Sequence, residues 1–339
     1  MRRRTMIMAA MAAAMTVAAS GCQKAEEPAE TAAASAEAAE TVTSIAEEET
    51  QEAEKEEDHD TGDAALDDPR NQDDIGEKEL LAVSFGTSYN DSRRRTIGAI
   101  ESTLEETFPE YSVRRGFTSG MIIQRIKSRD NVEIDSVEAA LDRALDNGVK
   151  ELVVQPTHLM NGLEYTDLVN ELAQYSDGFE KVAIGAPLLT SDEDLQKVIQ
   201  VIAEETAQYD DGETAICFMG HGTEAESNQV YEKMQNMIAE QGYENYFIGT
   251  VEAAPTLDQV MAAVQAGDYK RVVLEPLMIV AGDHANNDMA GDEEGSWKRT
   301  FEDAGYEVTC ILRGLGEMEG IRQIFAEHAQ AAMDSLEAQ

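Results

Sequence analysis

Apolar and polar residues alternate in a regular way along the chain from about residue 79 onward. Short, nearly continuous apolar runs such as 215–219 (AICFM) are typical of parallel strands that are covered on both faces. The longer stretches between them place apolar residues along one helical face. This pattern predicts an α/β fold of parallel sheets flanked by helices. The expected strands are 80–85, 111–117, 151–155, 181–185, 214–219, 246–250, 271–275 and 307–312, and the expected helices are 92–108, 136–147, 164–174, 192–209, 225–241, 257–266, 292–304 and 318–336.

The two halves of this pattern resemble each other. Residues 81–87 (LAVSFGT) parallel residues 217–223 (CFMGHGT), and residues 150–156 (KELVVQP) parallel residues 270–276 (KRVVLEP). The repeat predicts two similar lobes, 79–210 and 211–339, each of roughly 130 residues and each a parallel sheet with helices. A cleft between two such lobes is the default place for a ligand.

The first 22 residues have the features of an export signal. Arg2, Arg3 and Arg4 precede a short apolar stretch that is too short to span a bilayer comfortably, and the stretch ends in Ala-Ser-Gly-Cys at Cys22. Small residues before a cysteine resemble a bacterial lipobox, which predicts cleavage before Cys22 and diacylation of its thiol. The alternative is an ordinary signal peptide with a chance cysteine. The lipobox predicts an extracytoplasmic protein that touches the membrane through its lipid anchor alone.

Residues 23–78 are predicted to be a disordered, acidic tether. Residues 23–79 contain 21 Asp or Glu and 4 Lys or Arg, with almost no aromatic side chains. Such a segment cannot bury enough apolar surface to offset its ordering entropy. The chain carries a net charge of −42, of which residues 1–22 contribute +3 and residues 23–79 contribute −17, so −28 remains for the globular part. Nucleic-acid binding is therefore not expected, because it requires clustered cations.

Three of the five histidines follow predicted strands. His158, His221 and His284 each lie just after an apolar run and beside glycine or amide residues. The spacing of 63 residues between successive members excludes a helical i,i+4 metal motif. In an open parallel sheet the strand ends border one crevice, where imidazoles indicate metal binding or proton transfer. Each histidine taken alone also fits a hydrogen-bonded structural role.

Other residues at strand ends add to this picture. Glu252 ends the run 247–252 (FIGTVE), just after the expected strand 246–250, and is a candidate metal ligand or base. Gly86, Thr87 and Ser88 form a loop before a helix, where backbone N–H groups and hydroxyls can hold an anion. Neither a P-loop nor a Gly-x-Gly-x-x-Gly motif follows a strand, which argues against nucleotide binding.

The cysteines and arginines are less informative. Cys217 and Cys310 lie within apolar runs and are expected to be buried small hydrophobes, although a disulfide between them stays open. The sequence contains no Cys-x-x-Cys pair, which argues against a zinc finger or an iron–sulfur site. Arg93–Arg95, Arg114 and Arg115 are scarce cations, which we interpret as partners of substrate carboxylates or, for most of them, as surface ion pairs.

These segments together resemble the anaerobic sirohydrochlorin cobaltochelatase family of the CbiK type. The resemblance begins at about residue 79, continues in order to near the C-terminus, and implies the two-lobed chelatase fold that ferrochelatase shares. The matching stretches are 83–89 (VSFGTSY), 117–123 (FTSGMII), His158 with Asn161 and Gly162, 218–222 (FMGHG), 249–252 (GTVE), 276–285 (PLMIVAGDHA), 287–290 (NDMA) and 296–298 (SWK).

The resemblance implies a function and a site. It implies insertion of Co²⁺ into a sirohydrochlorin-like tetrapyrrole in the cleft, with release of two protons and no permanent cofactor, since the metal is a substrate. His158 and His221 are implied as the metal-binding pair, with Glu252 or a histidine as base and His284 in the cleft. Ni²⁺ and Fe²⁺ remain alternatives to Co²⁺ because imidazole and carboxylate sites bind several first-row metals.

Two alternatives stay open at this point. A non-catalytic, extracytoplasmic lipoprotein that binds a tetrapyrrole or a metal would need the same anchor and histidines. A metallohydrolase would need three zinc ligands and a positioned water, for which the sequence gives no demonstration. The typical relative works in the cytoplasm on cobalamin precursors, so the predicted lipid anchor is a departure from the family. The sequence leaves open whether the protein is a monomer or a homo-oligomer.

Overall fold

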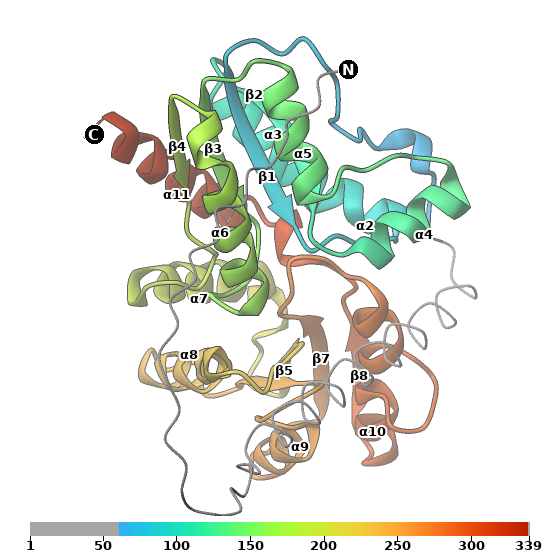
Figure 1. The fold of residues 1–339 in the computed structure, drawn as a ribbon. Coiled ribbons are helices and arrows are strands. Elements are labelled where there is room, and N and C mark those ends of the chain that lie inside the picture. The colour runs from blue at the N-terminus through green and yellow to red at the C-terminus, as the bar shows by residue number, and fades with distance from the viewer. Residues whose placement is uncertain (1–60, 338–339) are drawn as a thin grey trace, which may run out of the picture. The chain divides into compact units, whose positions relative to one another are not determined.

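The computed structural model describes residues 61–337, which contain two four-stranded parallel sheets. In the first sheet the strands β1 (Lys78–Ser84), β2 (Ser112–Phe117), β3 (Glu151–Pro156) and β4 (Lys181–Ile184) lie in the order β2-β1-β3-β4. In the second sheet β5 (Thr214–Gly220), β6 (Tyr246–Thr250), β7 (Arg271–Pro276) and β8 (Glu307–Cys310) lie in the order β6-β5-β7-β8. The eight predicted strands are confirmed to within two residues at each end, and so is the predicted fold class. We call each sheet with its helices a lobe (Figure 1).

The pairing of the strands shows that the lobes are structural repeats. In the first lobe Val83 lies opposite both Gly116 and Pro156. In the second lobe Met219 lies opposite both Gly249 and Pro276. Equivalent strands are thus paired in the same register. The predicted boundary between the two lobes, at residues 210 and 211, stays a prediction. The structure shows how the lobes pack, and it does not test whether each lobe folds by itself.

The helices agree with the sequence pattern in most places. The predicted helix 92–108 is two helices, α2 (Asn90–Arg95) and α3 (Ile97–Thr107), and the predicted helix 292–304 is reduced to α10 (Trp297–Asp303). Helix α4 (Gly120–Asp130) and the π-helical turn η6 (Ala285–Met289) were not predicted. Among the described helices none is both long enough and apolar enough to cross a membrane. The remaining helices are α5 (Val137–Asp146), α6 (Leu163–Tyr175), α7 (Asp192–Thr206), α8 (Gln229–Glu240), α9 (Leu257–Gln265) and α11 (Glu319–Glu337).

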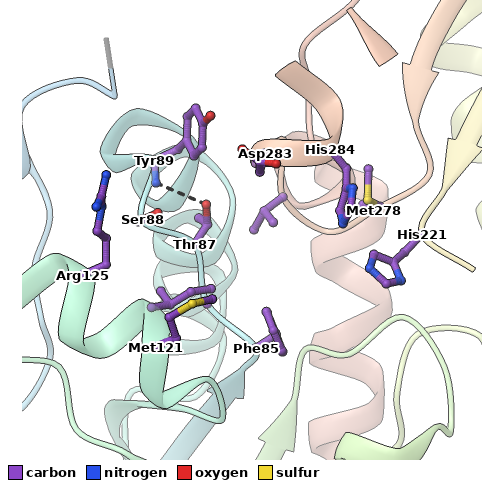
Figure 2. A pocket seen from close by; sticks show the side chains of 14 residues that line it. Phe85, Thr87, Ser88, Tyr89, Met121, Arg125, His221, Met278, Asp283 and His284 are labelled. Carbon is purple, nitrogen blue, oxygen red and sulfur yellow. Dashed lines mark hydrogen bonds between the residues drawn. The ribbon is translucent and has the colours of Figure 1, made fainter. Parts of the chain in front are cut away.

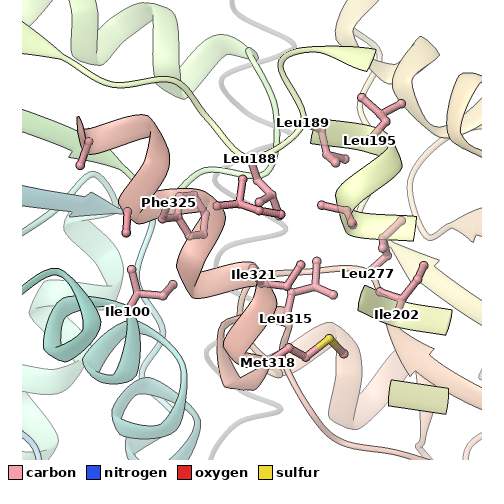
Figure 3. Packing of buried hydrophobic residues seen from close by; sticks show 14 of the residues in the cluster. Ile100, Leu188, Leu189, Leu195, Ile202, Leu277, Leu315, Met318, Ile321 and Phe325 are labelled. Carbon is pink, nitrogen blue, oxygen red and sulfur yellow. The ribbon is translucent and has the colours of Figure 1, made fainter. Parts of the chain in front are cut away.

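The last helix joins the two lobes. Although α11 follows the second lobe in sequence, it packs against α3, α7, β3 and β4 (Figure 1). Figure 3 shows Phe325 of α11 between Ile100 on one side and Leu188 on the other, and Ile321 of the same helix beside Leu315. Complete burial of each such side chain contributes about 1.5–3 kcal/mol to folding. The same apolar cluster includes residues of β1, β3, β5 and β6, so one continuous apolar core extends through both lobes.

The predicted disorder of residues 23–78 is wrong for residues 61–77. These residues lie against the first lobe: Asp63 caps the 3-10 turn Ala64–Leu66, and Asp67 and Arg70 form ion pairs with buried side chains. Composition alone could not show this, because the segment is held by specific ionic partners rather than by apolar burial. Residues 1–60, including Cys22 and the predicted signal peptide, lie outside the described residues.

Two of the arginines that attracted attention in the sequence are structural. Arg93 and Arg115 have 0% and 1% of their surface exposed, so they are neither surface ion pairs nor partners for a substrate. Both contact Asp67, and Arg115 also contacts Glu101, which is completely buried. These opposite charges compensate one another inside the first lobe, where an unpaired charge would be very costly.

The two described cysteines are free thiols. Cys217 is fully buried, as predicted, whereas Cys310 is half-buried. Leu274 of β7 lies between them, because it is in register with Cys217 on one side and with Cys310 on the other. Two strand spacings amount to roughly 9.6 Å, which is beyond the Cα distance that a disulfide can bridge.

Candidate functional site

Two adjoining cavities lie where strands of both lobes end. The larger cavity has a volume of about 320 Å³ and is bordered by Thr157 and His158 of the first lobe and by His221, Tyr231 and Met278 of the second. The smaller cavity has a volume of about 190 Å³ (Figure 2). The loop after β1 and helix α4 form one side of it, and His221, Met278, Asp283 and His284 form the other. Phe85, Gly86, His221, Met278 and Val280 line both cavities.

His221 lies at the junction of these cavities, directly after β5. Its Nδ1 atom is 2.8 Å from the carbonyl oxygen of Gly222. Because a carbonyl only accepts hydrogen bonds, this contact selects the tautomer of the neutral ring in which Nδ1 carries the proton and Nε2 has the lone pair. The backbone is fixed as well, since Glu252 N–H donates to the His221 carbonyl oxygen at 2.8 Å. Gly222 has φ of 90°, and a Cβ atom there would lie 2.9 Å from the backbone nitrogen of Ala253.

His284 is held next to His221 by a carboxylate. Its Nδ1 atom lies 2.7 Å from Oδ2 of Asp288, one turn later in η6. A carboxylate on one ring nitrogen fixes the orientation of an imidazole and makes the other nitrogen a better ligand. The rings of His221 and His284 are edge to face, with centroids 4.6 Å apart. The structure therefore brings these two imidazoles together, whereas the resemblance implied His158 and His221 as the metal-binding pair.

His158 borders the larger cavity from the first lobe, whereas His221 borders it from the second. It is only 8% exposed, and neither of its ring nitrogens has a hydrogen-bond partner among the described residues. Burial lowers the pKa of His158, and the nearby carboxylate of Glu164 opposes this shift only in part. The imidazole is therefore neutral near neutral pH. An unsatisfied buried polar group costs about 1–3 kcal/mol, so this side chain is poised to gain a partner.

The other predicted site residues are placed less uniformly. Glu252 is exposed, and it is not among the residues that line the two cavities. Gly86, Thr87 and Ser88 line the smaller cavity, with Thr87 and Ser88 buried. Helix α2 begins after them at Asn90. The structure thus brings this loop, His221 and His284 to one cavity, and leaves the Glu252 side chain outside it.

Sequence reasoning missed the apolar wall of the site. Phe85 is 47% exposed and Leu163 is 68% exposed, and both line the larger cavity with Met160 and Met278. Exposed apolar side chains gathered at a cavity are typical of a binding surface for an apolar ligand. The repeat could have revealed Met278, because it occupies in the second lobe the position that His158 occupies in the first. Arg125 was also missed, since it lies on the unpredicted helix α4.

Within residues 61–337 there is no group of three His, Cys, Asp or Glu side chains arranged to hold a metal ion. The site therefore offers a metal the His221 and His284 imidazoles, with further ligands left to water or to a bound molecule.

Comparison with known proteins shows which family the chain belongs to. Residues 78–334 match the family model described as cobalt chelatase (CbiK). The chain is 37% identical over 257 residues to the sirohydrochlorin cobaltochelatase of Salmonella typhimurium, covering 76% of this chain and 97% of the relative. It is 33% identical over 262 residues to the sirohydrochlorin cobaltochelatase CbiKC of Nitratidesulfovibrio vulgaris, covering 77% of this chain and 92% of that relative.

A solved structure supports the fold independently. The structure of SirB from Bacillus subtilis with Fe³⁺ superimposes with a TM-score of 0.54 at 12% identity, covering 78% of this chain and 98% of SirB. At that identity the likeness concerns the fold alone. The family match and the two curated relatives go further, because they cover most of the chain and nearly all of each relative. The chain belongs to the CbiK family of cobalt chelatases.

Proposed function

We propose that this protein is a metal chelatase that inserts Co²⁺ into sirohydrochlorin or a closely related tetrapyrrole. Family membership and the activity for which both curated relatives are named support the reaction and the substrates. The observation that carries the assignment within the molecule is the contact between His221 and His284. Their Nδ1 atoms are both engaged, by the Gly222 carbonyl and by Asp288, which favours metal binding through Nε2.

The second lobe receives the metal in this proposal. Imidazole is a borderline ligand that suits divalent first-row metals, so Co²⁺ can exchange water for the Nε2 atoms of His221 and His284. Two imidazoles leave most coordination positions to water, which a substrate metal must shed during insertion. The resemblance implies His158 and His221 instead, and both line the larger cavity. We prefer His221 and His284 because their rings are in contact. Ni²⁺ and Fe²⁺ would be accepted by the same ligands and are tested as alternative substrates.

The first lobe binds the macrocycle and accepts protons. The flat apolar face of a tetrapyrrole fits against Phe85 and Leu163 in the larger cavity. Each of the two pyrrole nitrogens must release a proton when the metal enters, and the neutral His158 imidazole accepts one at a time. Glu164 lines the same cavity and is exposed, so it stabilises the protonated imidazole and gives the proton an exit to solvent. Glu252 stays a candidate base whose backbone, rather than its side chain, holds His221.

The test is an insertion assay with purified protein, sirohydrochlorin and excess Co²⁺. Metallation is followed by the change in the absorption spectrum over many turnovers. We expect His221→Ala and His284→Ala to lose about 100-fold or more in rate, since each removes a ligand. His158→Ala should lose about tenfold or more, as general-base contributions are of this size or larger. The control is His328→Gln, because His328 contacts Ala186 and Asp194 away from both cavities.

Two results would contradict the proposal. One is an unchanged rate in both His221→Ala and His284→Ala, which would place insertion elsewhere. The other is the binding of a single equivalent of metal or tetrapyrrole without turnover, which would indicate a binding lipoprotein for uptake or storage. The same assay with Ni²⁺ and Fe²⁺ ranks the metals.

We also propose that the protein is exported and anchored by a lipid on Cys22. The support is the sequence of residues 1–22 alone, with its three arginines, short apolar stretch and small residues before the cysteine. Mass spectrometry of the mature N-terminus decides the matter: a diacylated Cys22 as the first residue supports the anchor, and an unmodified Cys22 within a longer chain contradicts it. Size determination in detergent at the same stage establishes the oligomeric state.

A further inference from the structure

Residues 61–77 lie outside the part of the chain that matches the family, yet they contact the helix that follows the loop bordering the smaller cavity. The family match begins at residue 78. Before it, the carbonyl oxygen of Thr61 accepts a hydrogen bond from Asp91 N–H at 2.8 Å, and that of Gly62 accepts one from Asn90 Nδ2 at 3.1 Å. Both donors belong to the first turn of α2, immediately after the loop 86–89 that lines the smaller cavity.

Asp67 reaches the same loop through Arg93. The Oδ2 atom of Asp67 accepts a hydrogen bond from Arg93 Nε at 2.7 Å. The other guanidinium nitrogens of Arg93 donate to the Thr87 carbonyl oxygen at 3.0 Å and to Asn90 Oδ1 at 2.6 Å. Because Arg93 is completely buried, its charge needs a fixed counter-charge, and Asp67 supplies it. The orientation of the Thr87 carbonyl thus depends on a carboxylate twenty residues earlier.

The charge of Asp67 is maintained despite its surroundings. Burial by itself would raise the pKa of Asp67, but hydrogen bonds and charges from Arg115 and Arg93 outweigh it and hold the pKa below its usual value of 3.8. Asp67 also accepts hydrogen bonds from both terminal nitrogens of Arg115, at 2.7 and 3.1 Å. One carboxylate therefore locks two buried guanidinium groups in place.

The same helix turn contacts the loop of the second lobe that leads to His284. Ser92 Oγ, in α2, accepts a hydrogen bond from Ala281 N–H at 3.0 Å. Thr87 Oγ1 lies 3.3 Å from the position that a Cβ atom on Gly282 would occupy, so these two loops are closely packed. His284 follows two residues later. A shift of α2 or of Thr87 would consequently be transmitted to both walls of the smaller cavity.

We propose that Asp67 is a positioning residue for the chelatase site and that residues 61–77 are an accessory clamp that this chain adds to the family fold. The clamp acts through Arg93 on the loop 86–89, and through α2 on the loop before His284. This inference rests on the proposed function for its kinetic consequence, while its structural consequence stands independently. Asp67 itself lines neither cavity.

The test compares two acid-to-amide substitutions in the same segment of the full-length protein. Asp67→Asn removes the charge opposite Arg93. Asp63→Asn is the matched control, because Asp63 is exposed and only caps Ala65 N–H at 2.9 Å, a bond that Asn also accepts. We expect Asp67→Asn to raise KM for sirohydrochlorin about tenfold through misplacement of the loop, with kcat changed by less than about threefold. Asp63→Asn should match wild type in both constants.

Two further measurements separate positioning from general stability. Amide hydrogen exchange of residues 86–92 and 281–284 should become faster in Asp67→Asn and not in Asp63→Asn, whether or not the protein is a chelatase. The double variant Asp67→Asn/Arg93→Gln should raise KM no more than Arg93→Gln alone, since Asp67 acts through Arg93. Unchanged exchange in Asp67→Asn overturns the clamp. So does a lowered melting midpoint with an unchanged KM, which would make Asp67 a purely stabilising residue.

The outcomes also distinguish this inference from the proposed function. If wild-type protein binds sirohydrochlorin but does not insert Co²⁺, the proposed function fails, and the dissociation constant from a fluorescence titration replaces KM in the comparison. If it does not bind sirohydrochlorin at all, the hydrogen-exchange result alone decides whether the clamp exists.

Discussion

The two lobes follow the same path through four parallel strands but present different side chains where those strands end. Val83 and Met219 are equivalent, because each lies opposite the proline that ends the neighbouring strand. Two residues later stand Phe85 in the first lobe and His221 in the second. Two residues after the equivalent prolines stand His158 and Met278 respectively. All four of these residues line the larger cavity, so each lobe contributes one imidazole and one apolar side chain. The imidazole follows the proline in the first lobe and follows the first strand in the second lobe.

The comparison teaches what a repeated fold keeps and what it changes. Both lobes keep a glycine with positive φ after the first strand, Gly86 at 107° and Gly222 at 90°, since the backbone turn is the same. The chemistry is divided instead. Glu164 and His284 also occupy equivalent positions, two residues after Gly162 and Gly282. In the function that we propose, the first lobe provides the proton acceptors and the second lobe provides the metal ligands.

The strongest test of this division exchanges the residues after the first strands. His221→Phe gives the second lobe the side chain of the first, and we expect it to lose about 100-fold or more in the rate of Co²⁺ insertion because a metal ligand is removed. Phe85→His gives the first lobe an extra imidazole and should lose less than about tenfold, since apolar contact alone is reduced. The metallation assay measures both. Equal losses would show that the lobes are not specialised.

The next test concerns the packing of the residues one position earlier, Ser84 in the first lobe and Gly220 in the second. Gly220 is equivalent to Ser84, but a Cβ atom at Gly220 would lie 2.4 Å from Cε1 of the buried Tyr231. Gly220→Ala should therefore reduce the free energy of unfolding by about 2–3 kcal/mol through overpacking. Ser84→Ala removes only the hydrogen bond to Thr157 at 2.6 Å and should cost about 1 kcal/mol. Urea denaturation gives both values, and a smaller cost at Gly220 would contradict the described packing.

A smaller effect is expected from the pH dependence of His158 compared with its equivalent, Met278. The pKa of His158 is lowered from its usual 6.5 in the folded state by burial. As the pH falls through 6.5, the unfolded chain takes up a proton that the folded protein does not, so folding becomes less stable; above 6.5 both states are neutral and the effect vanishes. When the pH is lowered from 7.5 to 5.5, the free energy of unfolding of His158→Met, measured by urea denaturation, should therefore decrease by less than that of wild type. A parallel loss in both proteins would indicate a pKa that is not lowered.

The sequence predicted the repeated scaffold better than the asymmetric site. The alternation of strand-like and helix-like stretches located all eight strands, and several of them, such as β5, are continuous apolar runs because they are buried on both faces. Helix α4 was missed because it starts at Gly120 and buries only Ile126 completely, so its periodicity is weak. Its ends were nevertheless marked by the cap Ser119 and by Asn131 in the left-handed conformation.

The sequence indicated where the histidines lie in the fold, but not which side chains they contact. His158, His221 and His284 were found because each follows a strand. The contact between His221 and His284 could not be foreseen, since it depends on the unpredicted turn η6 and on the side chain of Asp288. The clamp of residues 61–77 was hidden for a similar reason. Its acidic composition predicted disorder, and only the buried Arg93 and Arg115 explain why Asp67 is fixed.

The smallest effects are expected at the other ends of the strands, where the lobes agree even in their side chains. Lys150 Nζ is 2.5 Å from Glu77 Oε1, and Lys270 Nζ is 2.5 Å from Glu213 Oε1, and all four side chains are largely exposed. Exposed ion pairs contribute little, so Lys150→Ala and Lys270→Ala should each leave the melting midpoint within about 2 °C of wild type. Rates of Co²⁺ insertion should be unchanged, because these pairs lie far along the strands from both cavities. A large loss of stability or rate in only one of the two variants would mean that the two lobes differ at these ends, although their backbones agree. The functional difference between the lobes would then extend beyond the strand ends that border the cavities.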